Sequence, residues 1–138
     1  MPLQFIPQVH RTTHRIGLHI EQLDGASVNQ GEAHILAHLA FSDRATVADL
    51  HRAFAHKRST LTSILDRLEG RGLLERATDA RDRRTFVISL TARGRLLARR
   101  VSSHLAAFES RVLKRVSARD LAAFARVLDA LEETAEQP

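Results

Sequence analysis

The segment that runs from Arg58 to Leu90 constrains the fold more than any other part of the chain. Its first half repeats apolar residues at the spacing of one helical face, Leu61, Ile64, Leu65 and Leu68. Gly70 and Gly72 follow, as expected where a helix ends and the chain reverses. Short apolar and β-branched runs at 73–77 and 85–90 then flank a charged stretch. The segment therefore predicts a helix followed at once by a β-hairpin with a charged tip.

A second short helix is predicted just before this one. Thr46 and Asp49 have the spacing of an N-terminal cap, and the residues that would point inward are Val47, Leu50 and Phe54. The helices 46–54 and 57–69 fit a helix-turn-helix, although two successive amphipathic helices also occur in many helical bundles. A helix-turn-helix followed directly by a basic hairpin has the order of a winged helix, which the sequence therefore favours.

Helical spacing of apolar residues extends over most of the remaining chain. It predicts helices at 9–23, from Asn29 to a loop at 42–44, at 92–116 and at 117–131. The element order is then α-α-α-α-β-β-α-α, a mainly α fold with a small β-wing and a helical region outside the wing. The apolar stripes of the outer helices exceed what one small lobe can cover, which indicates a partner copy of the same chain.

The composition limits the class of protein. A chain of 138 residues with 43% apolar residues fits one globular domain. The sequence has neither a run long enough to span a bilayer nor a secretory pattern at its start, so we expect a cytoplasmic protein with no membrane partner. There is no cysteine, which excludes disulfides, thiolate metal ligands and cysteine-based oxidant sensing.

The charge favours a polyanionic partner. The formal net charge is +5 and the sequence pI is about 11.1. Every basic residue except Lys57 and Lys114 is arginine, which suits forked contacts to phosphate and guanine, although arginine-favouring codon usage could contribute. Together with a helix beside an arginine-rich hairpin, which can reach two grooves of a duplex at once, this favours double-stranded DNA as the partner.

The helix 57–69 carries small hydroxyl residues on the face opposite its apolar stripe. Such residues let a helix approach base edges closely, whereas a face in contact with water alone more often carries Glu–Lys pairs. Basic residues and free N–H groups at its start suit phosphate. The candidate DNA-contacting residues of this helix are Lys57, Arg58, Ser59, Thr60, Thr62, Ser63 and Arg67.

The predicted hairpin tip carries more arginine than solubility requires, Arg81, Arg83 and Arg84. Minor grooves concentrate negative potential and attract inserted arginine. We expect one of Arg83 or Arg84 to enter the groove and the other to hold a phosphate or a brace, and the sequence leaves open which. Asp79 and Asp82 are candidate braces.

Two histidine pairs, His10 with His14 and His34 with His38, have the i,i+4 spacing that could bind a metal or confer pH sensitivity. Histidines without a ligand are the commoner case, so we expect no metal and no cofactor. The sequence also lacks a Gly-rich phosphate loop and a Gly-x-Ser-x-Gly elbow, and its Ser, His and Asp residues form no pattern that favours nucleophilic catalysis. We therefore do not expect an enzyme.

The segments 65–76, 79–84 and 89–94 resemble the MarR family of bacterial winged helix-turn-helix transcription regulators. The resemblance extends, by element order, over almost the whole chain. It implies a homodimeric regulator, most often a repressor, with the helix 57–69 in the major groove of a pseudo-palindromic operator. We expect one domain over residues 1–138, in which 29–91 form the DNA-binding lobe and 1–28 and 92–138 form dimerisation helices.

The resemblance also assigns roles to single residues. The hydroxyl residues Ser59, Thr62 and Ser63 match the family's recognition face, and Arg84 matches its recurrent wing arginine. By the same likeness, Arg67 and Arg76 contact phosphates or brace the lobe. Some family members tie down the wing arginine with an acidic residue near the start of the recognition helix. That neighbourhood is basic here, so the brace comes from Asp66, Asp79 or Asp82, or is missing.

Many members of this family are released from DNA by small aromatic molecules that bind where the dimer helices meet the DNA-binding lobe. In this chain that junction would involve His10, His14, His38 and Phe41. Two alternatives stay open: a metal- or pH-responsive regulator of the same fold, and a winged-helix module that binds another protein.

Overall fold

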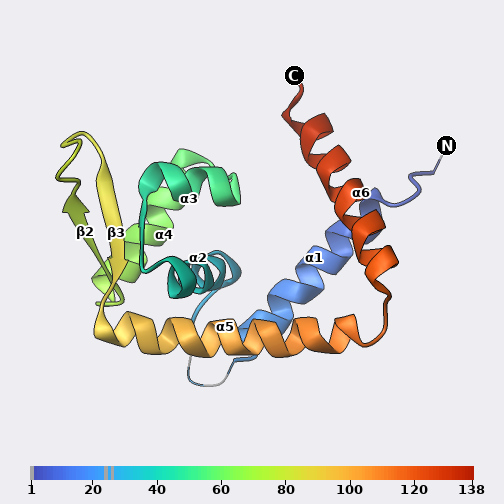
Figure 1. Cartoon of the computed structure of the whole chain (residues 1–138), viewed down its shortest axis with the longest axis horizontal. Coiled ribbons are helices and arrows are strands. Elements are labelled where there is room, and N and C mark those ends of the chain that lie inside the picture. The colour runs from blue at the N-terminus through green and yellow to red at the C-terminus, as the bar shows by residue number, and fades with distance from the viewer. Residues whose placement is uncertain (1, 24, 26) are drawn as a thin grey trace. The chain divides into compact units, whose positions relative to one another are not determined.

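A computed structural model describes residues 2–23, 25 and 27–138 (Figure 1). Its helices and strands are, in chain order, α1 (Ile6–Glu21), α2 (Gln30–Ser42), β1 (Arg44–Thr46), α3 (Val47–Phe54), α4 (Arg58–Gly70), β2 (Leu74–Thr78), β3 (Phe86–Leu90), α5 (Ala92–Leu113) and α6 (Ala118–Glu136). The predicted class, mainly α with a small β-wing, is confirmed. No helix within the described ranges has the length and apolar character needed to cross a bilayer.

The strand β1 was missed by the sequence prediction. Within the described residues the sheet has three strands in the order β1-β3-β2, and both pairings are antiparallel. Arg44 pairs with Ser89, although the sequence assigned Arg44 to a loop. A segment of this length is too short to show the alternation by which strands are recognised. Asp43, with φ 53°, turns the chain from α2 into the strand.

In the described part of the chain, capping boxes set the starts of three helices, including the cap predicted for Thr46 and Asp49. Asn29 and Glu32 bond reciprocally at the start of α2, and Thr46 with Asp49 and Ser117 with Asp120 do the same for α3 and α6. The predicted ends were less accurate. α1 spans Ile6–Glu21 in place of 9–23, α5 ends at Leu113 in place of 116, and α6 continues to Glu136 in place of 131.

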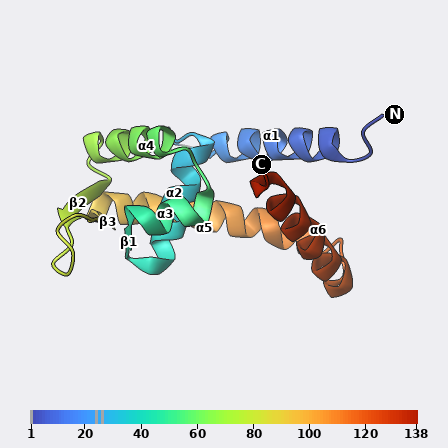
Figure 2. The same ribbon diagram turned by 90° about the horizontal axis from the view of Figure 1, so that it is seen from above.

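The described residues divide between His104 and Leu105 into two compact units. In the first unit, α2 contributes several buried residues to the core, and the whole apolar stripe of α4 packs against that core. The largest fully buried side chains are Ile20, Ile35, Leu36, Leu39, Leu50, Leu61, Leu65, Leu68, Leu74, Ile88 and Val101. The loop between β2 and β3 projects away from the helices of this unit (Figures 1 and 2). The core thus fixes α4 and the hairpin while leaving their outer faces open.

The second unit consists of the end of α5 together with α6. None of its described residues is buried, and apolar side chains are exposed along it, among them Leu121, Phe124, Val127 and Leu128. The predicted division into a lobe at 29–91 and dimerisation helices at 1–28 and 92–138 stays a prediction.

Candidate nucleic-acid interface

The helix α4 is divided lengthwise into a buried and an exposed face. Leu61, Leu65 and Leu68 are no more than 1% exposed and Ile64 is 4% exposed. The side chains that the sequence singled out on this helix and at its cap are all exposed, Lys57, Arg58, Ser59, Thr60, Thr62, Ser63 and Arg67. The structure therefore gathers these seven residues on one accessible helix.

Local contacts arrange the polar groups of this helix. The Thr62 hydroxyl donates to the Arg58 carbonyl at 2.9 Å, which leaves the oxygen free to accept a further hydrogen bond. Arg67 Nη1 donates to the Ser63 hydroxyl at 3.4 Å. Lys57 occupies the N-cap without capping the helix through its side chain. N–H groups left uncapped at a helix start are suited to bind an anion such as phosphate.

The wing arginine Arg84 is held in place by Asp82. One carboxylate oxygen, Asp82 Oδ1, accepts from the Arg84 backbone N–H at 3.0 Å and from Arg84 Nε at 3.2 Å. These two bonds hold the pKa of Asp82 below its ordinary value, and the bond from the backbone N–H has the larger effect. The Arg84 side chain is nonetheless 91% exposed. Among the candidate braces, Asp82 is the one in contact with Arg84.

The other two aspartates have different partners. Asp79 accepts from the Arg81 backbone N–H at 3.0 Å, which shapes the tip of the wing. Asp66 pairs with Arg76, whose Nε also lies 2.9 Å from Glu69 Oε2. The hydrogen bonds that Arg76 donates, first to Asp66 and then to Glu69, raise the pKa of Arg76. Arg76 thus links β2 to α4, and its side chain is 24% exposed.

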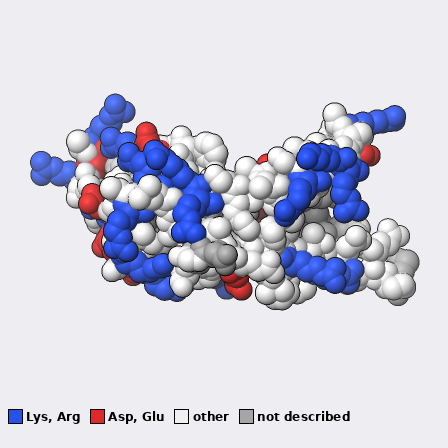
Figure 3. Space-filling model, turned by 90° about the horizontal axis from the view of Figure 1, so that it is seen from below, with Lys and Arg blue, Asp and Glu red and all other residues white. Residues whose placement is uncertain are grey.

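Arg44 is a candidate that the sequence analysis missed. It lines a groove of about 420 Å³ together with Thr46, Asp49, Asp79 and Arg81, between β1, the start of α3 and the wing. Lys and Arg side chains spread over the end of the first unit that carries the wing (Figure 3). No sequence signal placed Arg44 beside the wing, because the β1–β3 pairing that brings it there was not predicted.

The four residues predicted for an effector pocket do not line the groove beside the wing or the groove beside α4. His10 and His14 are exposed on α1, and Phe41 is 84% exposed at the end of α2. His38 is partly buried, with its ring edge-on to Phe54 at 5.4 Å between centroids.

A groove of about 550 Å³ lies nearby, bounded by α2, α3 and α4. Its lining includes His34, Phe54, His56, Thr60 and Arg67, and none of the four residues predicted for the effector. His56 Nδ1 is buried and has no hydrogen-bond partner among the described residues. Burial, followed by repulsion from His56, holds the pKa of His34 below its ordinary value of 6.5. The groove thus combines an aromatic ring, two imidazoles and a guanidinium beside the exposed helix.

The lowered pKa of His34 predicts acid sensitivity. As the pH falls through about 6.5, the unfolded chain takes up the proton before the folded one does, so the folded state loses stability. Above that pH His34 is neutral in both states, so its titration does not change the free energy of unfolding. We expect His34→Gln to make the free energy of unfolding less dependent on pH between about 7.5 and about 5.5. Urea unfolding of both proteins at each pH measures this, and identical pH dependence would contradict it.

Among the residues that the structure describes, no three His, Asp or Glu side chains come together in a way that could hold a metal ion. His34 and His38, one of the two pairs singled out in the sequence, lie on α2, and the other pair lies on α1.

Comparison with known proteins agrees with this geometry. Residues 26–85 match the sequence model of the MarR family. An HTH-type transcriptional repressor of Mycobacterium tuberculosis is 33% identical over 84 residues, which cover 61% of this chain and 60% of the repressor. An HTH-type transcriptional repressor of Mycobacterium bovis matches equally well. The chain therefore spans about three fifths of the length of these curated relatives.

Solved structures share the fold over nearly the whole chain. MepR of S. aureus in complex with DNA has a TM-score of 0.84 at 21% identity, covering 98% of this chain and 100% of that one. PcaV of Streptomyces coelicolor in complex with its natural ligand has a TM-score of 0.79 at 20% identity, covering 99% of this chain and 100% of PcaV. These likenesses show a common winged-helix fold. By its winged helix-turn-helix segment, residues 26–85, the chain is similar to the MarR family.

Proposed function

We propose that the chain is a homodimeric, sequence-specific DNA-binding transcription repressor. The observation that carries the proposal is the pairing of an exposed, hydroxyl-lined α4 with a wing that presents Arg84 to solvent. Support also comes from the curated relatives, which are repressors, and from MepR, whose structure includes DNA.

In this proposal α4 lies in the major groove and the wing reaches the adjacent minor groove. A helix fits the major groove, where Ser59, Thr62 and Ser63 would read base edges. Arg84 would enter the minor groove, whose negative potential favours a guanidinium. The start of α4 and Arg67 would hold phosphates, which fix the register without reading the sequence.

Exposed apolar side chains support the dimer. Ile6, Val9 and Leu18 on α1 are each at least 38% exposed, as are Leu121 and its neighbours on α6. Patches of this kind on a soluble protein usually mark an interface. A twofold dimer would present two copies of α4 to half-sites about 10 base pairs apart or a multiple of that distance.

Effector release is a further part of the proposal. The groove beside α4 supports it, because Phe54 offers an aromatic contact while the guanidinium of Arg67 would attract an acid group. A ligand there would touch α4 directly. PcaV, a structural neighbour, was solved with its natural ligand. His38 contacts Phe54, which lines this groove. The involvement of His10, His14 and Phe41 rests on the family resemblance alone.

The test is to select fragments of the parent genome with purified protein and to titrate the bound duplexes at increasing salt. We expect one pseudo-palindromic sequence to be enriched and its affinity to fall steeply with salt, because phosphate contacts release counterions. Enrichment of no sequence over random duplex would overturn the proposal and favour the protein-binding alternative.

We expect Ser63→Ala to change sequence preference more than overall affinity. Loss of one hydroxyl contact to a base edge removes roughly 1 kcal/mol of discrimination, or about fivefold, at one position of the operator. Competition titrations with single-base operator variants measure this. Ser110→Ala, at an exposed serine on α5, is the matched control and should leave every preference unchanged. An unaltered base profile for Ser63→Ala would remove Ser63 from the proposed interface.

A further inference from the structure

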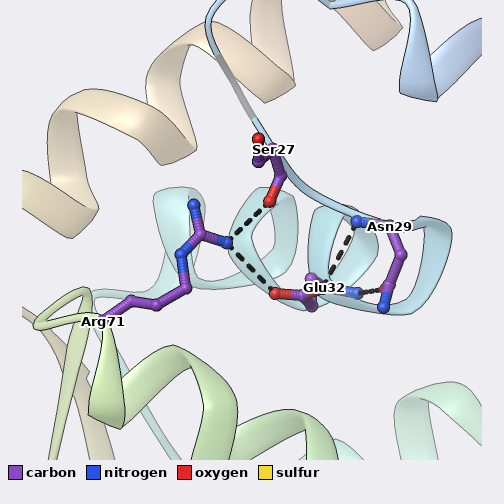
Figure 4. A network of polar contacts seen from close by, with 4 residues as sticks. All are labelled: Ser27, Asn29, Glu32 and Arg71. Carbon is purple, nitrogen blue, oxygen red and sulfur yellow. Dashed lines mark hydrogen bonds and ion pairs between the residues drawn. The ribbon is translucent and has the colours of Figure 1, made fainter.

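Arg71, the residue that caps the C-terminal end of α4, reaches across to the segment that precedes α2. Its guanidinium points at Ser27 and Glu32 (Figure 4). Arg71 Nη1 donates to the Ser27 carbonyl at 2.7 Å and lies 3.3 Å from Glu32 Oε2. One side chain therefore joins the end of α4 to residues on both sides of the start of α2.

Glu32 makes this link rigid because its two carboxylate oxygens have different partners. While Oε2 faces Arg71, Oε1 accepts from the Asn29 N–H at 3.3 Å, and Asn29 Oδ1 accepts from the Glu32 N–H at 2.9 Å. The Glu32 side chain is only 7% exposed, whereas that of Arg71 is 39% exposed. A carboxylate buried to this degree needs a charged partner, so the Arg71 contact is strongly favoured in the folded state. The capping box and the ion pair hold one another in place.

The segment that Arg71 holds leads to α1. Ser27 and Asn29 lie in the connection between α1 and α2. The next helix after α4 is tied to the same residue, since Arg93 Nη1 on α5 donates to the Arg71 carbonyl at 3.4 Å. Under the proposed function, on which this inference rests, α4 enters DNA and α1 enters the dimer. The network is then a polar link between the helix that reads DNA and the segment through which the chain arrives from the helix that meets the partner copy.

We propose that Arg71 is a positioning residue which, through Glu32 and the Ser27 carbonyl, fixes the separation of the two α4 helices in the dimer. It thereby sets the half-site spacing that the protein accepts. Inserting one base pair moves a half-site by about 3.4 Å and rotates it by about 34°, because 10 to 10.5 base pairs complete a turn. A rigid pair of recognition helices cannot follow that movement, whereas a loosened pair can.

The experiment uses the duplex that the full-length wild-type protein selects, with its half-sites moved by one base pair in either direction. We expect wild-type affinity to fall at least about tenfold with each change, and that of Arg71→Ala to fall less than about threefold. Arg71→Leu combined with Glu32→Gln removes the pair without leaving a buried charge, keeps an acceptor for Asn29, and should behave like Arg71→Ala. Arg95→Ala, which removes the same charge from an exposed site on α5, should behave like the wild type.

Two further readouts separate positioning from a general loss of structure. The affinity of the variants for a duplex with a single half-site should equal that of the wild type. Their circular dichroism should show a folded protein, and their molecular mass in solution should be that of a dimer. The inference is overturned if the folded variants keep wild-type spacing discrimination, or if single half-site binding falls as much as operator binding. A wild-type protein that selects no duplex would instead overturn the proposed function. If Arg71→Ala does not fold, the double variant decides.

Discussion

We expect Gly94→Ala to lower the free energy of unfolding by about 3 kcal/mol or more, at the upper end of what overpacking costs. A Cβ atom at this position would lie 1.7 Å from the Leu73 carbonyl oxygen and 2.7 Å from its carbon. Both atoms belong to the backbone, so no side-chain rotation relieves the clash. The first turn of α5 would have to move away from the start of the wing.

The surrounding hydrogen bonds oppose that movement. The Thr91 hydroxyl accepts from the Gly94 N–H at 3.0 Å and donates to the Gly72 carbonyl at 2.6 Å. The Thr91 N–H donates to the same Leu73 carbonyl at 3.1 Å. Relief of the clash therefore breaks contacts that cap α5 and close the hairpin.

Urea unfolding followed by circular dichroism, at equal protein concentrations because a dimer is expected, measures this loss. Gly70→Ala is the matched control. A Cβ there meets nothing within 4 Å, and alanine in place of glycine in a helix should add about 0.5 to 1 kcal/mol of stability. Equal stabilities for Gly94→Ala and wild type would show that α5 does not approach Leu73 this closely.

The winged-helix order could be predicted because each of its signals is local. The apolar stripe of α4, the glycines after it and the alternation around a charged tip all lie within one segment. Gly72, with φ +71°, takes a conformation that glycine adopts most readily. β1 could not be found in this way, since its identity as a strand comes from pairing with residues 87–89, far along the chain.

The site shows the same division between local and distant contacts. The bond from the Arg84 N–H to Asp82 spans two residues, so the Asp-x-Arg spacing is a usable signal for this brace. The pairing of Arg76 with Asp66 depends on how β2 returns along α4, and nothing in the sequence distinguishes it from other pairings. The groove beside α4 draws on three helices, which explains why the predicted effector residues do not line it.

Arg84→Ala should weaken binding to the selected operator by about ten- to a hundredfold, and binding to unrelated duplex in similar proportion. The guanidinium is exposed and already held by Asp82, so little ordering is required when it meets DNA. Because it neutralises phosphate charge in any sequence, its removal should also reduce the slope of log affinity against log salt by about 0.9.

A double-mutant cycle tests whether Asp82 acts through Arg84. Asp82→Asn should weaken operator binding less than Arg84→Ala, because the arginine remains but loses its ionic partner. In the Arg84→Ala background the same change should no longer weaken binding, since the group that Asp82 positions is gone. Arg95→Ala again controls for net charge, and it should leave both affinity and salt slope near wild-type values. Additive losses in the cycle would mean that Asp82 does not position Arg84, and an unchanged salt slope for Arg84→Ala would place the wing away from DNA.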